Sequence, residues 1–343
     1  MRRYIIRRLL QAVPLLFIIS VILFVLMAEM GDPLATFGGR GVIKSRDRIR
    51  LTRQLGLDKP VWMQYVTWLI GNDWLKLDLD GDGVFESYGT RKGILRGDMG
   101  FSFVTRRPVI EMIVERLPNT LLLMLVSEVI TLVVALVIGL TSALKQYSAY
   151  DHLVTALSFI GYSMPIPLLA LGLIYLLAVT PKRWGLPHFP TGGMFDPAAG
   201  PGALQTIWHM VLPVTALSLI AAAGYSRYVR SNMLEVIRED YIRTAHAKGL
   251  PNWEVIFRHA LKNAALPLVT IVGMDLPFLL AGAVVTESIF AWPGMGRLFY
   301  DHTVRSDFPV VMGILLIVSS AVVIFQILTD VTYTFLDPRI RYN

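Results

Sequence analysis

Long apolar runs separated by polar intervals dominate this chain. Six runs reach about 20 residues or more, the length that crosses the hydrocarbon core of a bilayer as an α-helix. Their hydrophobicity is continuous, whereas a transmembrane β-barrel would show short alternating segments. The pattern predicts an all-α polytopic membrane protein with six transmembrane helices, at residues 9–28, 117–140, 153–179, 206–228, 266–290 and 309–335.

Two features modify this simple picture. The third run contains Pro165 and Pro167, which predict a kinked span that neighbouring helices can tolerate. The first run is followed by a long polar region, 29–116, in which the piece 60–70 is amphipathic and rich in Trp and Tyr. We interpret this region as a folded extracytoplasmic subdomain. Its many Lys and Arg residues are compatible with that side, because long loops are exempt from the positive-inside rule.

The basic residues orient the spans. Four arginines precede the first run, and further Lys and Arg residues lie in the polar stretch 226–267 and in the tail 337–343. With six spans all three segments fall on one side, so the positive-inside rule predicts cytoplasmic N- and C-termini. A cleaved signal peptide is the alternative for the N-terminus, but the first apolar run is longer than the usual apolar region of a signal.

The stretch 226–267 is the longest polar interval in the second half of the chain. Apolar residues recur in it at helical spacing (Leu234, Ile237, Tyr241 and Ala245), and Gly249-Leu250-Pro251 then breaks the pattern. A second helical run follows, with Asn252 as its expected N-cap and its end near Pro267. We predict two short helices that form a docking device, the alternative being an ordinary solvated loop.

Composition narrows the possible chemistry. The chain has 343 residues, 54% of them hydrophobic and 17% charged, and it contains no cysteine. Disulfides and thiolate metal sites are therefore excluded. The net charge of +7 lies largely beside apolar runs, so it does not indicate nucleic-acid binding. No phosphate-binding loop or H-E-x-x-H motif is present, so we predict no catalytic residues and no ATP hydrolysis by this chain alone.

Acidic residues inside the predicted spans are the next candidates, because a charge in a span is costly and usually faces a cavity or the protein interior. Glu128 lies near the middle of the second span and Asp275 in the first half of the fifth. They are candidate pathway residues, the alternative being protonated or hydrogen-bonded packing groups. Glu287 and Asp330 lie near span ends, where we favour local structural roles.

A cluster of carboxylates in the polar region resembles the first half of a calcium loop. Alternating carboxylates followed by glycine let oxygens converge on a hard cation, although Gly89 stands where such a loop would place its bidentate Glu. The alternative is a polar turn. The calcium hypothesis concerns a structural ion, and its candidate ligands are Asp78, Asp80, Asp82 and Glu86.

Several motifs in order resemble the permease subunits of ABC importers. The general E-A-A-x-x-x-G loop motif is matched only at Ala245 and Gly249, with Leu266-Pro267 further downstream than usual. The segment 240–250 instead resembles the dipeptide, oligopeptide and nickel branch of this family. It reads Asp240-Tyr-Ile-Arg-Thr-Ala-His-Ala-Lys-Gly-Leu250. Further segments resemble the same branch: 54–60, 97–102, 116–120, 286–297 and 336–342.

The resemblance implies a type I importer fold and a multi-subunit complex in a bacterial or archaeal plasma membrane. A second homologous permease, two ATPase subunits carrying ATP and Mg, an extracytoplasmic binding protein and the lipid bilayer would be the partners. No cofactor would bind this chain apart from the hypothetical calcium ion. The implied parts are 1–28 (N-terminus and first helix), 29–116 (extracytoplasmic subdomain), 117–336 (permease core, with coupling loop 229–265) and 337–343 (cytoplasmic tail).

The resemblance also gives the docking stretch a role in coupling to the ATPases. Tyr241, Ile242, Ala245 and Leu250 would supply knobs for an ATPase groove, Arg243 and Lys248 charged contacts, and Gly249 the sharp turn. The candidate coupling residues are Asp240, Tyr241, Ile242, Arg243, Thr244, Ala245, Lys248, Gly249 and Leu250.

The cargo is left more open than the mechanism. Di- and oligopeptides are the expected cargo, and acids at Glu128 and Asp275 would suit an amine-bearing molecule. Oligosaccharides or nickel chelates are alternatives within the same importer type. An ion-coupled secondary transporter is a further alternative, although no internal repeat of the kind such folds show is found. Nothing specific favours a channel or a scaffold protein.

Overall fold

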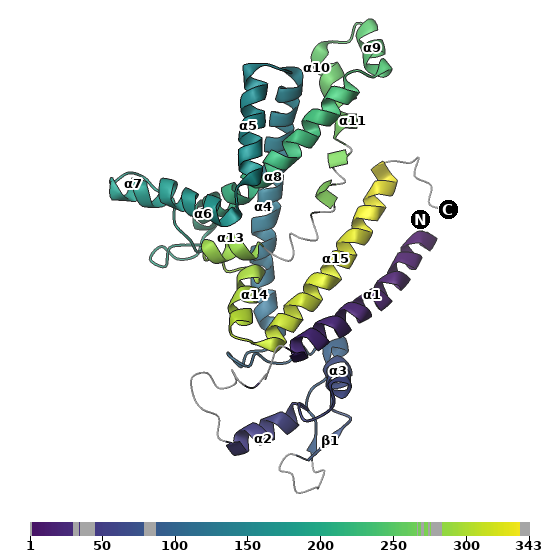
Figure 1. Ribbon diagram of the computed structural model, residues 1–343, viewed down its shortest axis with the longest axis vertical. Helices are drawn as coiled ribbons and strands as arrows, with labels where there is room; N and C mark the ends of the chain where they lie inside the picture. Colours follow the sequence, from purple (N-terminus) through teal and green to yellow (C-terminus); the bar gives the residue numbers. More distant parts are fainter. Residues whose placement is uncertain are drawn as a thin grey trace. The chain divides into compact units, whose positions relative to one another are not determined.

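The computed structural model describes residues 2–29, 34, 45–78, 87–265, 267–268, 271–273, 275 and 283–336, without the side chains of 2–5, 45–47 and 330–336. The chain forms two compact units, one built from Met1–Pro118 and Leu298–Val323, the other from Asn119–Arg297 and Ile324–Asn343. The described elements are almost entirely helical (Figure 1). This confirms the predicted all-α class.

The first unit combines membrane-length helices with a small polar subdomain. Its core contains Met27, Trp68 and Met312, and Tyr65 approaches α1 through a 2.8 Å hydrogen bond with Ser20. The two strands are antiparallel, with Lys76 opposite Tyr88. Its elements are α1 (Arg2–Glu29), α2 (Ser45–Gln54), α3 (Val61–Ile70), β1 (Lys76–Leu77), β2 (Ser87–Tyr88), the 3-10 turn η1 (Ile94–Arg96), the start of α4 (Val109–Leu144), most of α14 (Met295–Val304) and much of α15 (Phe308–Leu336).

A buried polar network holds the start of α15 in this unit. The Asp307 carboxylate, fully buried, accepts hydrogen bonds from Ser102 Oγ at 2.5 Å and from the Phe103 N–H at 2.9 Å, and lies 2.8 Å from His302 Nδ1. Burial by itself would raise the pKa of Asp307, but the hydrogen bonds from His302, Ser102 and the backbone together lower it. The residues before α4 are thereby joined to the turn between α14 and α15.

The second unit is a helical assembly around α8. Gly139 of α4 lets that helix approach α8 closely, since a Cβ there would lie 2.6 Å from Val229 Cβ and 2.7 Å from the Ser226 carbonyl oxygen. The remaining elements are α5 (Ala149–Ser163), α6 (Ile166–Ile174), the π-helical turn η2 (Tyr175–Val179), α7 (Thr180–Arg183), α8 (Ala203–Val236), α9 (Asp240–Ala247), α10 (Asn252–Glu254), the π-helical η3 (Val255–Leu261), α11 (Lys262–Ala264) and α13 (Val284–Ile289).

The third predicted span is broken rather than kinked. α5 ends at Ser163 and α6 begins at Ile166, with Met164 and Pro165 both in extended conformations. Pro165 lacks an N–H and disfavours a helical residue before it, which weakens the helix at this point and allows the break. Figure 1 shows α6 and α7 running in a different direction from α5. The prediction of one kinked span over 153–179 is therefore wrong.

Five described helices are long and apolar enough to cross a membrane: Ile6–Glu29, Val109–Leu144, Ile166–Arg183, Ala203–Val236 and Phe308–Thr329. They correspond to the first, second, fourth and sixth predicted spans and to the later part of the third. Two extend well beyond the predicted bounds, since α4 begins at Val109 and α8 continues to Val236. The fifth predicted span, 266–290, is described only in part, because residues 266, 269–270, 274 and 276–282 lie outside the described residues.

Candidate functional site

The polar stretch after α8 folds into a short helical hairpin, which we call the coupling hairpin (residues 237–264). α9 ends in a turn at Gly249, whose φ of +78° lies in the left-handed region and whose N–H donates to the His246 carbonyl oxygen at 2.9 Å. In the described part of the chain, no atom outside the adjoining residues lies within 4 Å of the position that a Cβ would take at Gly249. The glycine is therefore required by backbone conformation and not by lack of space.

The second arm of the hairpin runs continuously through α10, η3 and α11. The residue that caps it is Pro251, with ψ of 144°, and no side chain caps the first turn. The expected N-cap, Asn252, is instead the first helical residue, because proline is pre-organised for the extended conformation that precedes a helix. Asn263 Nδ2 donates to the Tyr241 hydroxyl at 3.1 Å, and Asn232 Nδ2 to the Ala264 carbonyl oxygen at 3.3 Å. These bonds join the two arms and attach them to α8.

Two of the predicted ATPase-facing knobs point inward. Ile242 is 3% exposed and Ala245 is 5% exposed, and both belong to the hydrophobic core that includes Val229 and Val255. Leu250 is partly buried against the same core. Their burial stabilises the hairpin by removing apolar surface from water. Because this chain already covers Ile242 and Ala245, little of either side chain is left to insert into a partner, and their part in coupling stays a prediction.

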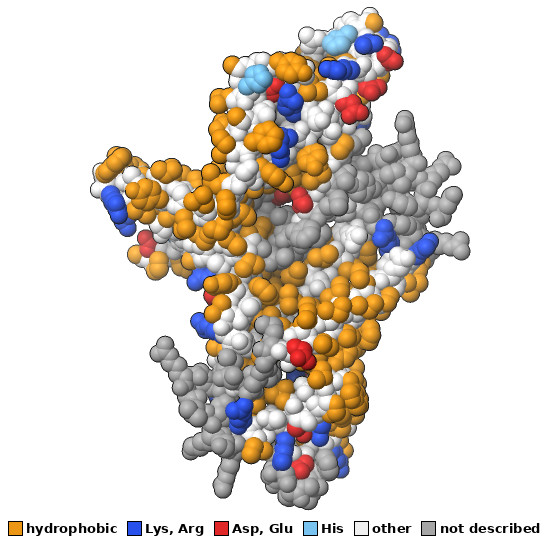
Figure 2. Space-filling model, in the orientation of Figure 1, with side chains coloured by type: hydrophobic (Ala, Val, Ile, Leu, Met, Phe, Trp, Pro, Cys, Tyr) orange, Lys and Arg blue, Asp and Glu red, His pale blue; other side chains and the backbone are white. Residues whose placement is uncertain are grey.

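Other residues of the hairpin present large exposed surfaces. Tyr241 is 41% exposed, Trp253 67% and Phe257 56%. Sequence reasoning missed Trp253 and Phe257, although their spacing of four places them on one helical face. The polar members of the predicted set, Asp240, Arg243, Thr244 and Lys248, are also exposed. Figure 2 shows charged and histidine side chains gathered over the end of the second unit that carries α9 and α10.

The structure brings the two candidate pathway acids together. The Tyr225 hydroxyl donates to Asp275 Oδ2 at 2.6 Å, and Glu128 is close enough to both residues to interact electrostatically. Glu128 is 8% exposed, and its Oε1 has no hydrogen-bond partner among the described residues. Two carboxyl groups from different helices thus meet at one tyrosine, with an acceptor atom left over. Such a group favours a proton or an external cation.

Glu287 belongs to a separate and fully bonded arrangement. It accepts hydrogen bonds from Thr120 Oγ1 at 2.8 Å and from the Arg297 N–H at 3.0 Å, and it is completely buried. A Cβ on Gly294 would overlap its carboxylate, and Trp292 Nε1 donates to the Asn119 carbonyl oxygen at 3.0 Å. The glycine-rich turn therefore closes over Glu287, in keeping with the predicted local role. The side chain of Asp330 lies outside the described residues.

The calcium hypothesis stays a prediction. Asp80, Asp82 and Glu86 lie outside the described residues, and Asp78 is the last described residue before them. Within the part of the chain that the structure describes, no three His, Cys, Asp or Glu residues are grouped closely enough to hold a metal ion.

Comparison with known proteins identifies the family to which this chain belongs. Residues 135–342 match the family described as binding-protein-dependent transport system inner membrane component, and residues 1–124 match its N-terminal membrane-component counterpart. The chain belongs to this family. It is accordingly a multi-pass membrane subunit of an ABC importer, a class that works with ATPase and binding-protein partners.

Two curated relatives match over the full length of both chains. The oligopeptide transport system permease protein AppB of Bacillus subtilis (strain 168) is 40% identical over 344 residues, and the dipeptide transport system permease protein DppB of Escherichia coli (strain K12) is 36% identical over 365. Among solved structures, an inward-facing MetNI methionine ABC transporter matches with a TM-score of 0.48 and 19% identity, over 66% of this chain and 97% of that one.

Proposed function

We propose that this chain is a permease subunit of an ATP-driven peptide importer. The cargo follows from the names of its full-length relatives, which are oligopeptide and dipeptide permeases. Nickel chelates and oligosaccharides are not favoured by these names. The proposed assembly pairs the chain with a second homologous permease, two ATPase subunits that carry ATP and Mg, and a separate binding protein. In it, the chain has six spans in a type I importer fold and cytoplasmic termini.

The observation that carries the proposal is the construction of the coupling hairpin. Its inner residues are buried against α8, and its outer face leaves Tyr241, Trp253 and Phe257 uncovered. Large exposed aromatic residues on a rigid mount are typical anchors of a protein interface. A rigid-body closure of ATPase subunits could be transmitted through such a hairpin into α8. ATP hydrolysis itself would take place on the partners, since this chain has no nucleotide-binding motif.

The proposed passage of peptides gives the acidic pair a role. A peptide with a free amino terminus carries a cation, and Glu128 and Asp275 together offer carboxylate oxygens of which one has no partner among the described residues. We assign the Glu128–Tyr225–Asp275 cluster to contact with that amino group during translocation. A neutral cargo would lack the charge attraction that an ammonium group gains from these carboxylates.

The experiment first measures how much of the ATPase subunits copurifies with the affinity-tagged permease. It then measures the rate of ATP hydrolysis by the complex in the presence of peptide-loaded binding protein. Trp253→Ala should lower retention or stimulated hydrolysis by about tenfold, because truncation of an interface aromatic anchor costs more than about 1 kcal/mol and about 1.4 kcal/mol is a factor of ten. The matched control is Trp184→Ala, since Trp184 is 74% exposed but lies beyond α7, away from the hairpin. Equal behaviour of the two variants would overturn the proposed coupling surface.

A second pair of variants tests the rigid turn. Gly249→Ala should impair coupling because an L-residue at a φ of +78° costs about 1–2 kcal/mol. Gly249→Asn should be milder, since asparagine tolerates the left-handed region. An alanine variant as active as the asparagine variant would show that the turn can relax without loss of function.

A further inference from the structure

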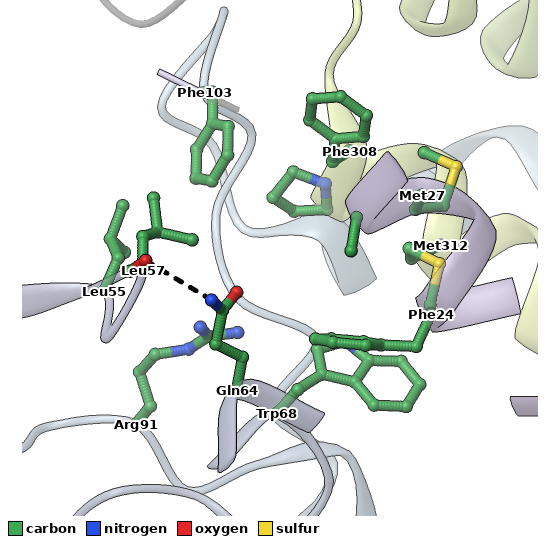
Figure 3. Close-up of a pocket in the computed structure, with 12 residues that line it drawn as sticks. Phe24, Met27, Leu55, Leu57, Gln64, Trp68, Arg91, Phe103, Phe308 and Met312 are labelled. Carbon is green, nitrogen blue, oxygen red and sulfur yellow. Dashed lines mark hydrogen bonds between the residues drawn. The ribbon is translucent and has the colours of Figure 1, made fainter. Parts of the chain in front are cut away.

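The first unit contains a cavity of about 100 Å³ that the importer mechanism does not use. That volume equals roughly three water molecules, so it accommodates part of a ligand rather than a whole one. Four described segments and two membrane helices form its walls, and Figure 3 shows their side chains converging on it. The lining residues are Phe24, Met27, Ala28, Leu55, Leu57, Gln64, Trp68, Arg91, Phe103, Phe308, Pro309 and Met312.

Most of the cavity wall is apolar, and its polar groups lie together. Figure 3 shows Arg91 and Gln64 on one side, with Trp68, Phe24 and Met312 on the other. Gln64 Nε2 is already engaged, since it donates to the carbonyl oxygens of Leu57 at 3.3 Å and Lys59 at 2.8 Å. Among the described residues that line the cavity, Arg91 is therefore the only one that carries a charge.

Arg91 is held rigidly through its backbone. Its N–H donates to Asn72 Oδ1 at 2.9 Å, and its carbonyl oxygen accepts from the Asn72 N–H at 2.9 Å. Asn72 is itself 4% exposed. The guanidinium passes close to Gly100, where a Cβ would lie 3.2 Å from Nη2. Buried partners thus fix the backbone from which the Arg91 side chain extends toward the cavity.

The side chain of Arg91 has no ion-pair or hydrogen-bond partner within the described part of the chain. It is partly buried, and burial lowers the pKa of its guanidinium, with only the more distant charge of Asp98 acting against that. Arginine nevertheless stays charged in proteins. A partly desolvated cation whose donors meet no acceptor among the described residues is unfavourable unless an anion approaches it. The lining of the cavity therefore favours an anionic ligand with an apolar portion.

The surroundings indicate which anion this is. The cavity lies at the end of the apolar run of α1 (Phe24 to Ala28) and at the start of α15, where both helices leave their membrane-length stretches. Earlier in α1, Leu10 and Val13 are each 68% exposed, as lipid-facing residues would be. Trp62, Trp74 and Tyr88 of the adjoining subdomain are at least half exposed. Exposed tryptophan and tyrosine residues mark the headgroup level of a bilayer.

We propose that this cavity binds an anionic phospholipid, with the phosphate on Arg91 and the first apolar groups of the lipid against Phe24, Trp68 and Met312. The same site would explain why a subdomain outside the spans is rich in Lys and Arg, because such residues attract acidic headgroups. A lipid bound there would link α1, α3 and the start of α15 through one ligand. This inference is independent of the cargo.

The test uses the full chain purified with its partner subunits, stripped of lipid and reconstituted with equal amounts of phosphatidylglycerol and phosphatidylcholine. Native mass spectrometry then counts retained lipids. Wild type should retain phosphatidylglycerol preferentially, and Arg91→Gln should reduce that retention about tenfold, as expected for loss of a charged hydrogen bond. Lys92→Gln is the matched control. It removes the same charge one residue away, on an exposed side chain outside the cavity.

Two further variants distinguish loss of the lipid site from misfolding of the protein. Arg91→Lys keeps the charge and should keep most of the preference, while losing some affinity with the bidentate geometry. Ala28→Leu fills the cavity wall and should weaken lipid retention with Arg91 intact. Equal retention by wild type and Arg91→Gln, or equal losses in Arg91→Gln and Lys92→Gln, would overturn the proposal.

Competition experiments distinguish a bound phospholipid from other anions that could occupy the cavity. Inorganic phosphate and a free tripeptide, each at millimolar concentration, should leave phosphatidylglycerol bound to wild type, because neither fills the apolar wall. Displacement by phosphate would overturn the lipid assignment in favour of a simple anion site. Displacement by the tripeptide alone would overturn it in favour of a peptide carboxylate.

Discussion

Arg230 and Asp151 form a two-pronged ion pair, in which Arg230 Nε lies 2.7 Å from Asp151 Oδ1 and Nη2 lies 2.7 Å from Oδ2. The Ser142 hydroxyl and the Tyr147 N–H also donate to the same carboxylate. The side chain of Asp151 is 3% exposed and that of Arg230 is 27% exposed. The pair joins the first turn of α5 to α8, near the end of α8 from which the coupling hairpin continues.

The first prediction concerns the pH dependence of this pair. The hydrogen bond from Arg230 holds the pKa of Asp151 well below its usual range, and Ser142 and Tyr147 lower it further against the opposing effect of burial. A depressed carboxyl pKa stabilises the folded state above the unfolded pKa of about 3.9, and this contribution is lost as the pH falls below that value. Asp151→Asn should therefore reduce stability by roughly 2 kcal/mol at pH 7, allowing for the exposure of Arg230.

Thermal unfolding of the purified complex at pH 7, 5, 4 and 3 measures this effect. The difference in melting temperature between wild type and Asp151→Asn should be constant from pH 7 to 5 and should become smaller below about pH 4. Asp240→Asn serves as the control, because the Asp240 side chain is 97% exposed and lies 3.5 Å from Arg243. A gap that is unchanged at pH 3 would contradict the assignment of stability to the ionised carboxylate.

The second prediction concerns the close approach of α4 and α8. Gly139→Ala should destabilise the protein by roughly 1–3 kcal/mol, because the new methyl group would meet the backbone oxygen of Ser226 and the Cβ of Val229. Gly172→Ala in α6 is the matched control, since no atom lies within 4 Å of its Cβ position. There, alanine should stabilise the helix by up to about 1 kcal/mol. Similar melting midpoints for the two variants would show that the helices can separate freely.

The third prediction addresses the acidic cluster in transport. Glu128→Gln and Asp275→Asn should each slow uptake of trialanine about tenfold, which corresponds to loss of one hydrogen bond to a charged group. Uptake of N-acetyl-trialanine should be poor in wild type and little changed in the variants, because it lacks the amino-terminal cation. Proteoliposomes containing the whole importer provide the measurement.

Glu111→Gln controls for the loss of an acid from the same helix, since Glu111 is exposed at the start of α4. Equal slowing for both peptides would mean that Glu128 and Asp275 serve packing. Uptake at wild-type rates in both variants would remove the cluster from the pathway altogether.

The length of the apolar runs and the chemistry of single turns are local properties, so they could be predicted from the sequence. The all-α class, the spans over 9–28, 117–140, 206–228 and 309–335, and the turn at Gly249 follow from them. Family motifs carried the prediction of an importer permease. Local pattern failed at Pro165, where the choice between a kink and a break depends on whether neighbouring helices can satisfy the freed backbone groups.

Which way a side chain faces was decided only by tertiary structure. Ile242 and Trp253 are both apolar residues of the coupling hairpin, yet one is buried against α8 and the other is exposed. The meeting of Glu128 with Asp275, and the position of Arg91 in the wall of an apolar cavity, likewise depend on segments far apart in the sequence. Apolar run length predicts that a helix forms and where it runs in the chain. Burial and pairing are relations between helices, and only their packing determines them.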